Sequence, residues 1–104
     1  MSRGPDAATL LGRALVAASE RAGCPVSLAE ADWTRWASAT FAGARHSVVL
    51  VGTQSPALDA WLAALPEAEF ALRGHLVADL KLVRVRHAGA ARTVEIEALT
   101  VEER

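Results

Sequence analysis

Three histidines, His46, His75 and His87, are the side chains best suited to acid–base or metal chemistry. Histidine changes charge near neutral pH without help from its surroundings. None of the three has the spacing of a metal motif such as HExxH or paired CxxC. His75 and Asp79 are four residues apart, which on a strand separates them by about 13 Å. The spacing favours strand-end or surface histidines and predicts no metal site and no cofactor.

Cys24 is the single cysteine, so an intramolecular disulfide is excluded and a reducing compartment is expected. It lies between Gly23 and Pro25, just past a predicted helix C-terminus. The negative end of the helix dipole raises a thiol pKa there, which disfavours a nucleophile. The chain also has no glycine-rich phosphate loop and no GxSxG motif, so the sequence predicts no catalytic residue.

A candidate ligand pocket is bounded by Trp33, Trp36 and His46, with Arg45 available to pair an anionic group. Tryptophan rings can line a pocket for a planar molecule, but they more often pack in a core. This set supports an alternative function, a small-molecule-binding domain or a small enzyme.

Nucleic-acid binding is disfavoured by the charge balance, since 11 basic residues stand against 12 acidic ones. The last thirty residues contain a basic set that two glutamates on the neighbouring predicted strand largely neutralise. The basic residues are Lys81, Arg84, Arg86, His87 and Arg92, and the glutamates are Glu95 and Glu97.

The 104 residues fit one domain. The first residues lack the apolar stretch of a signal peptide, and no apolar run reaches the roughly 18–20 residues of a membrane span. We therefore expect a cytoplasmic protein with no membrane partner.

Hydrophobic periodicity predicts helices over about 5–22 and 53–65, with Pro5 in the first turn of one, and Ser55 capping the other before Pro56. Strands are expected at 36–42 and 47–51, loosely at 26–30, with a turn at Gly43-Ala44. The 47–51 strand has four consecutive large apolar residues after Ser47 and should be central, covered on both faces. Two further strands, 75–87 and 92–101, form a hairpin. The predicted fold is α+β, a mainly antiparallel sheet of four or five strands with two helices, in the order α-β-β-(β)-α-β-β.

The last hairpin changes its apolar face near residue 82, because large apolar residues move from even to odd positions. Pairing Val85 with Val94 and Val83 with Ile96 puts these four on one side, with Leu80 on the other. This register also places Arg84 opposite Glu95, a favourable cross-strand pair.

Two interpretations of the change of face remain open. Irregularities in both strands could return every apolar residue to one core. Alternatively the faces differ, and Val83, Val85, Val94 and Ile96 form an interface under a helix or a partner subunit. The second interpretation leads to the main functional prediction, a non-catalytic interaction or assembly domain that acts as a homodimer.

Overall fold

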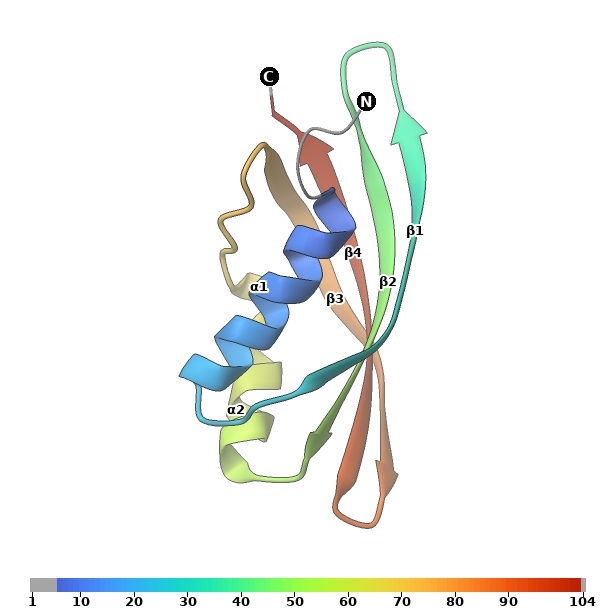
Figure 1. Cartoon of the computed structure of the whole chain (residues 1–104). Helices are drawn as coiled ribbons and strands as arrows, with labels where there is room; N and C mark the ends of the chain where they lie inside the picture. The colour runs from blue at the N-terminus through green and yellow to red at the C-terminus, as the bar shows by residue number, and fades with distance from the viewer. Residues whose placement is uncertain (1–5, 104) are drawn as a thin grey trace.

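The predicted α+β architecture is confirmed by the computed structural model, which describes residues 6–103. Four antiparallel strands form one sheet in the order β1-β2-β4-β3. Both helices cover the same side of this sheet (Figure 1). None of the described helices is long and apolar enough to cross a membrane. In chain order the elements are α1 (Ala7–Arg21), β1 (Ser27–Ala37), β2 (Ala42–Thr53), α2 (Pro56–Ala64), the 3-10 turn η1 (Leu65–Glu67), β3 (His75–Ala88) and β4 (Ala91–Glu102).

Side-chain caps fix the starts of both helices. The Ser55 hydroxyl accepts a hydrogen bond from the Leu58 N–H at 3.0 Å, and Pro56 opens α2 as predicted. In α1 the cap is Asp6, whose carboxylate accepts from the Thr9 N–H at 2.9 Å. Pro5, predicted in the first turn, lies outside the described residues.

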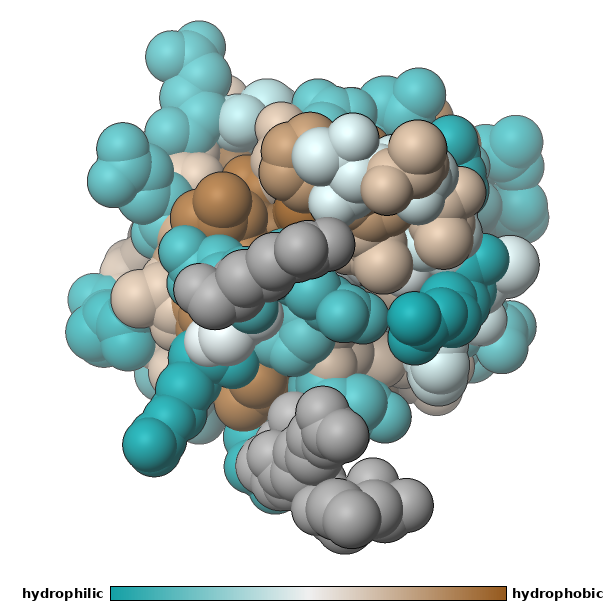
Figure 2. Space-filling model, turned by 90° about the horizontal axis from the view of Figure 1, so that it is seen from above, coloured by the Kyte–Doolittle hydropathy of each residue, from teal (hydrophilic) through white to brown (hydrophobic). Residues whose placement is uncertain are grey.

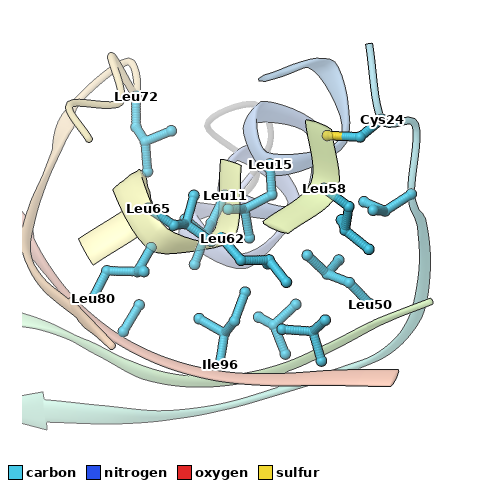
Figure 3. Packing of buried hydrophobic residues seen from close by; sticks show 14 residues of the cluster. Leu11, Leu15, Cys24, Leu50, Leu58, Leu62, Leu65, Leu72, Leu80 and Ile96 are labelled. Carbon is cyan, nitrogen blue, oxygen red and sulfur yellow. The ribbon is translucent and has the colours of Figure 1, made fainter. Parts of the chain in front are cut away.

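The hydrophobic core lies between the two helices and the sheet (Figure 3). Leucines from α1, α2 and η1 point toward valine, leucine and isoleucine side chains of β2, β3 and β4. Fully or almost fully buried members include Leu11, Leu15, Leu58, Leu65, Leu50, Val94 and Ile96. Burying a side chain of this size stabilises the fold by about 1.5–3 kcal/mol.

One polar residue, Ser19, is fully buried where α1 meets the start of β1. Its hydroxyl donates to the Val16 carbonyl at 2.7 Å and accepts from the Val26 N–H at 3.0 Å. It therefore connects the last turns of α1 to the chain that enters β1.

We expect Ser19→Ala to destabilise the protein by about 1–3 kcal/mol, because the buried Val26 N–H loses its acceptor. Ser27→Ala is the control, since the Ser27 hydroxyl makes only a long, exposed contact of 3.5 Å with Val51. Urea unfolding of both variants measures the difference. Equal stabilities would show that Ser19 has no bridging role.

The turn predicted at Gly43-Ala44 is wrong, because both residues lie inside β2. The chain turns earlier, between Ser38 and Phe41. The Ser38 hydroxyl accepts from the Phe41 N–H at 3.0 Å, and the Ser38 N–H donates to the Phe41 carbonyl at 2.7 Å. This serine turn closes the β1–β2 hairpin, so β1 takes in Trp36 and β2 begins at Ala42. The prediction that residues 47–51 belong to a central strand is confirmed. The prediction that both faces of this strand are covered is wrong, because both helices lie on one side of the sheet and Ser47 is exposed on the other (Figure 1).

The last hairpin has the predicted register only near its loop. Val85 pairs with Val94 and Arg84 with Glu95, as expected. The ladder then shifts between Leu82 and Arg84, so that Ile96 faces Leu82. A second shift, between Val77 and Asp79, leaves Ala78 as another extra residue in β3.

The predicted placement of these four residues on the side opposite Leu80 is therefore wrong for three of them. The predicted change of apolar face does occur in β4, where Leu99 and Val101 point away from the helices. Val94 and Ile96 are buried at 0% and 1% exposure, and Val85 packs against the same core. Only Val83, the extra residue at a bulge, is exposed, at 47%. β3 rotates its side chains at each bulge. β4 needs no bulge, because small or polar residues continue its buried face; these are Ala98 and Thr100.

Candidate functional site

The helices leave one side of the sheet uncovered, and we call this side the open face. Strand alternation and the ladder registers assign its residues. They are Glu30, Asp32, Thr34 and Trp36 of β1; Arg45, Ser47, Val49 and Val51 of β2; Thr93, Glu95, Glu97, Leu99 and Val101 of β4; and Leu76, Asp79, Lys81, Arg84 and Arg86 of β3.

At one end the open face is apolar across all four strands. Trp36, Gly43, Val101 and Leu76 are consecutive partners in one row. Trp36 and Val101 are half-buried, whereas Leu76 is 55% exposed. Apolar surface reaches solvent between polar side chains at the end of the molecule that carries the β1–β2 turn (Figure 2). A large apolar side chain on an uncovered sheet is a candidate contact residue.

The two edges of the open face carry opposite charge. β1 contributes the acidic residues Glu30 and Asp32, and the opposite edge strand, β3, contributes three basic residues and one acidic residue, Asp79. Two of the three pair with glutamates of β4, Lys81 with Glu97 at 3.6 Å and Arg86 with Glu95 at 3.1 Å. Within residues 6–103 the third, Arg84, and both acidic residues of β1 have no ion-pair partner.

A trough of about 430 Å³ lies in the middle of this face. Arg45 stands in it, flanked by Asp32 of β1 and by Glu97 and Leu99 of β4. No carboxylate of the described chain lies within ion-pair distance of Arg45. The lining also includes Lys81 and a third carboxylate, Asp79, so Arg45 lies among acidic neighbours without a direct ion pair to any of them.

The four residues of the predicted pocket lie on two different sides of the sheet. Trp36 and Arg45 belong to the open face. Trp33 and His46, paired in the β1–β2 ladder, point to the helix side. Trp33 is 50% exposed there because α1 does not cover it, while His46 is almost completely buried. Trp36 and Arg45 thus share the open face, whereas the lining of the trough includes Trp33, Arg45 and His46 and leaves out Trp36.

His46 is held at the N-terminal end of α1. Its Nε2 lies 2.9 Å from the Thr100 hydroxyl, and its Nδ1 is buried without a hydrogen-bond partner among the described residues. Burial lowers the pKa of His46; nearby Asp6 opposes this shift and His75 adds to it. At neutral pH the ring is therefore uncharged, and its side chain is buried on the helix side of the sheet.

The remaining sequence candidates show no converging chemistry. Cys24 is buried, and this burial raises the pKa of its thiol. Across residues 6–103, no three histidine, cysteine, aspartate or glutamate side chains come together where they could hold a metal ion. The open face is the surface on which large apolar side chains and charged side chains without ion-pair partners lie together.

Comparison with known proteins gives one distant likeness. No family model matches the chain, and no curated protein matches its sequence. Among solved structures, a chain from the virion of a native gene transfer agent particle is similar, with 20% identity and a TM-score of 0.48. The match covers 78% of this chain and 69% of that one. The functional assignment therefore depends on the chain's own residues.

Sequence reasoning missed most of the open face as a site. The signal was present in Leu99 and Val101, whose odd positions were assigned to the same core as Leu80. Because Ala98 and Thr100 occupy the buried face beside them, the two large residues lie on the other side.

Proposed function

We propose that this chain is a non-catalytic assembly domain that forms a homodimer through the open face of its sheet. The observation that carries the proposal is a row of apolar side chains on a sheet surface that no helix covers. In this row Val101 lies between Trp36 and Leu76 at its edges, and Leu99 follows in the next row along β4, between Arg45 and Asp79.

Half-burial of these side chains supports self-association. Each is partly shielded by its neighbours on the sheet and still has apolar area to bury. Burying such area contributes about 25 cal/mol per Å² removed from water. Symmetric dimers with one self-complementary patch are the commonest oligomers of small domains. The predicted interface at Val83, Val85, Val94 and Ile96 is not part of this proposal, because three of its members already pack inside the chain.

We expect Leu99→Lys to convert the dimer into a monomer, because it removes a large apolar side chain from the contact surface and places a charge there, next to Val101. Sedimentation velocity should give the wild type twice the chain mass of 11.0 kDa and the variant the single mass. Leu28→Lys is the control, since Leu28 is 44% exposed and lies on the helix side of β1. A wild type that is monomeric at every concentration contradicts the proposal, and so does a dimer that survives Leu99→Lys.

A second candidate function is binding of a small anionic ligand in the trough, and the unpaired Arg45 is the observation that favours it. A bound carboxylate or phosphate would give this guanidinium the bidentate partner that it lacks. A thermal-shift panel of small anions tests this function. A ligand that raises the melting temperature of the wild type and not of Arg45→Ala supports it, and no response to any anion counts against it.

A further inference from the structure

We infer that the two copies pack open face to open face about a two-fold axis parallel to the strands, so that β1 of each copy lies over β3 of the other. This inference rests on the proposed dimer and specifies its symmetry. It follows from the order of the strands and from the distribution of charge over them.

A two-fold axis parallel to the strands, placed between two facing sheets, reverses the strand order of the partner. The order β1-β2-β4-β3 then faces β3-β4-β2-β1, while each row across the sheet still faces the same row. Aligned sheet packing keeps the strand directions of the two layers within about 30°. Each edge strand of one copy is thus covered by the opposite edge strand of its partner.

The charged rows become complementary in this arrangement. Glu30 and Arg84 stand at the two ends of one row, so Glu30 faces the partner's Arg84. Asp32 and Lys81 end the adjacent row, so Asp32 faces the partner's Lys81. Symmetry doubles each contact, which gives four pairs of opposite charge along the two rims of the interface. Glu30, Asp32 and Arg84, unpaired within the described chain, gain partners.

The apolar rows are complementary as well. Trp36 and Leu76 end their row on opposite strands, so Trp36 lies over the partner's Leu76. In the next row Arg45 lies over the partner's Leu99. The partner's Glu97 lies one row further along the same strand. The trough then becomes an internal space in which the unpaired Arg45 and the partner's Glu97 stand on facing sheets.

Other ways of pairing two copies bring like charges together. A two-fold axis across the strands puts Glu30 and Asp32 over the same residues of the partner. Side-by-side pairing of two β3 edges opposes Lys81 and Arg84 to themselves, and the bulges at Ala78 and Val83 interrupt that edge. Repulsion between these like charges disfavours both alternative arrangements of the two copies.

The ion pairs within each sheet do not compete strongly with this interface. Lys81 and Glu97 are more than half exposed in their 3.6 Å contact. An exposed pair of this kind contributes about 0–1 kcal/mol, so either side chain can reorient at small cost.

Charge reversal with complementation tests the symmetry. One variant carries Glu30→Lys and Asp32→Lys, and the other carries Lys81→Glu and Arg84→Glu. Alone, each places like charges on both rims, and we expect its dimer dissociation constant to rise on the order of 10- to 100-fold. Mixed together, the two variants restore opposite charge on both rims, so a heterodimer of near wild-type affinity should form.

Control variants carry the same change of net charge away from the open face. Glu67→Lys with Glu69→Lys matches the first variant, and Arg13→Glu with Arg73→Glu matches the second; all four residues are exposed. These controls should stay dimeric. Circular dichroism of every variant confirms that it is folded.

The outcomes separate the two proposals. A monomeric wild type overturns the proposed function and this inference together. A wild-type dimer that neither charge variant weakens leaves the function intact and overturns the symmetry, as does a mixture that forms no heterodimer. Complementation into species larger than a dimer also overturns it, because edge-to-edge pairing of β1 with β3 is open-ended.

Discussion

Replacing Gly43 with alanine should lower the free energy of unfolding by about 2–3 kcal/mol, the upper part of the range for overpacking. A Cβ at Gly43 would overlap the carbonyl oxygen of Thr100, which belongs to the backbone of β4 and cannot swing away. The same atom would come within 3.0 Å of the Trp36 indole nitrogen. The β2–β4 ladder must therefore separate locally, at the apolar row of the open face. Thermal unfolding measures the effect, and about 1 kcal/mol corresponds to about 4–8 °C in a domain of this size.

Gly12→Ala is the matched control, since the same added methyl group meets a different neighbour. At Gly12, inside α1, it would approach only the end of the Leu28 side chain, at 3.2 Å. Leu28 is 44% exposed and can move. Alanine also favours a helix interior over glycine by about 1 kcal/mol. Gly12→Ala should therefore be neutral or stabilising. A Gly43→Ala protein as stable as the wild type would contradict the close approach of β2 to β4.

The second large effect is a loss of stability at acid pH through His46. Burial lowers the pKa of His46 in the folded protein below its ordinary value of 6.5, so the unfolded chain binds a proton that the folded chain resists. Stability is therefore complete above about pH 6.5. It falls as the pH drops below that value, with a slope approaching about 1.4 kcal/mol per pH unit, and levels off below the folded-state pKa. The physical reason is the buried Nδ1, which has no acceptor among the described residues for the added proton.

Urea unfolding at a series of pH values tests this. His46→Gln keeps a donor for Thr100 and removes the titration, so its stability should lose most of the slope between neutral pH and pH 5. The exposed His87 provides the control, because His87→Gln should leave the slope unchanged. If the stability of His46→Gln falls with decreasing pH as steeply as that of the wild type, groups other than His46 cause the acid sensitivity.

Much of the fold could be predicted because local chemistry determines it. Ser55 with Pro56 specifies the start of α2, and the apolar run of 47–51 specifies a central strand. One of the two errors concerns a local turn, and the other concerns long-range strand pairing. Ser38 forms a turn that its own short sequence signals only weakly, and the bulges in β3 depend on how β4 packs against the helices. Neither the turn nor the bulges can be predicted from the hydrophobic periodicity of a single strand.

The candidate site was predicted less well for the same reason. Arg45 and Trp36 were identified, but alternation assigns residues to faces only once the strand bounds are known. With the turn misplaced at Gly43-Ala44, residues 36 and 46 could not be placed on opposite sides of the sheet. The bulge in β3 likewise put Val83 in solvent and Leu82 in its place against Ile96.

Side-chain footprinting with hydroxyl radicals, carried out on dilute and concentrated samples, tests most directly whether the open face is the contact surface. Trp36, Leu76 and Leu99 should become protected as the protein concentration rises. Leu28, exposed on the helix side of β1, should be labelled equally throughout. Protection at Leu28 with unchanged labelling of Leu76 and Leu99 would contradict assembly through this face.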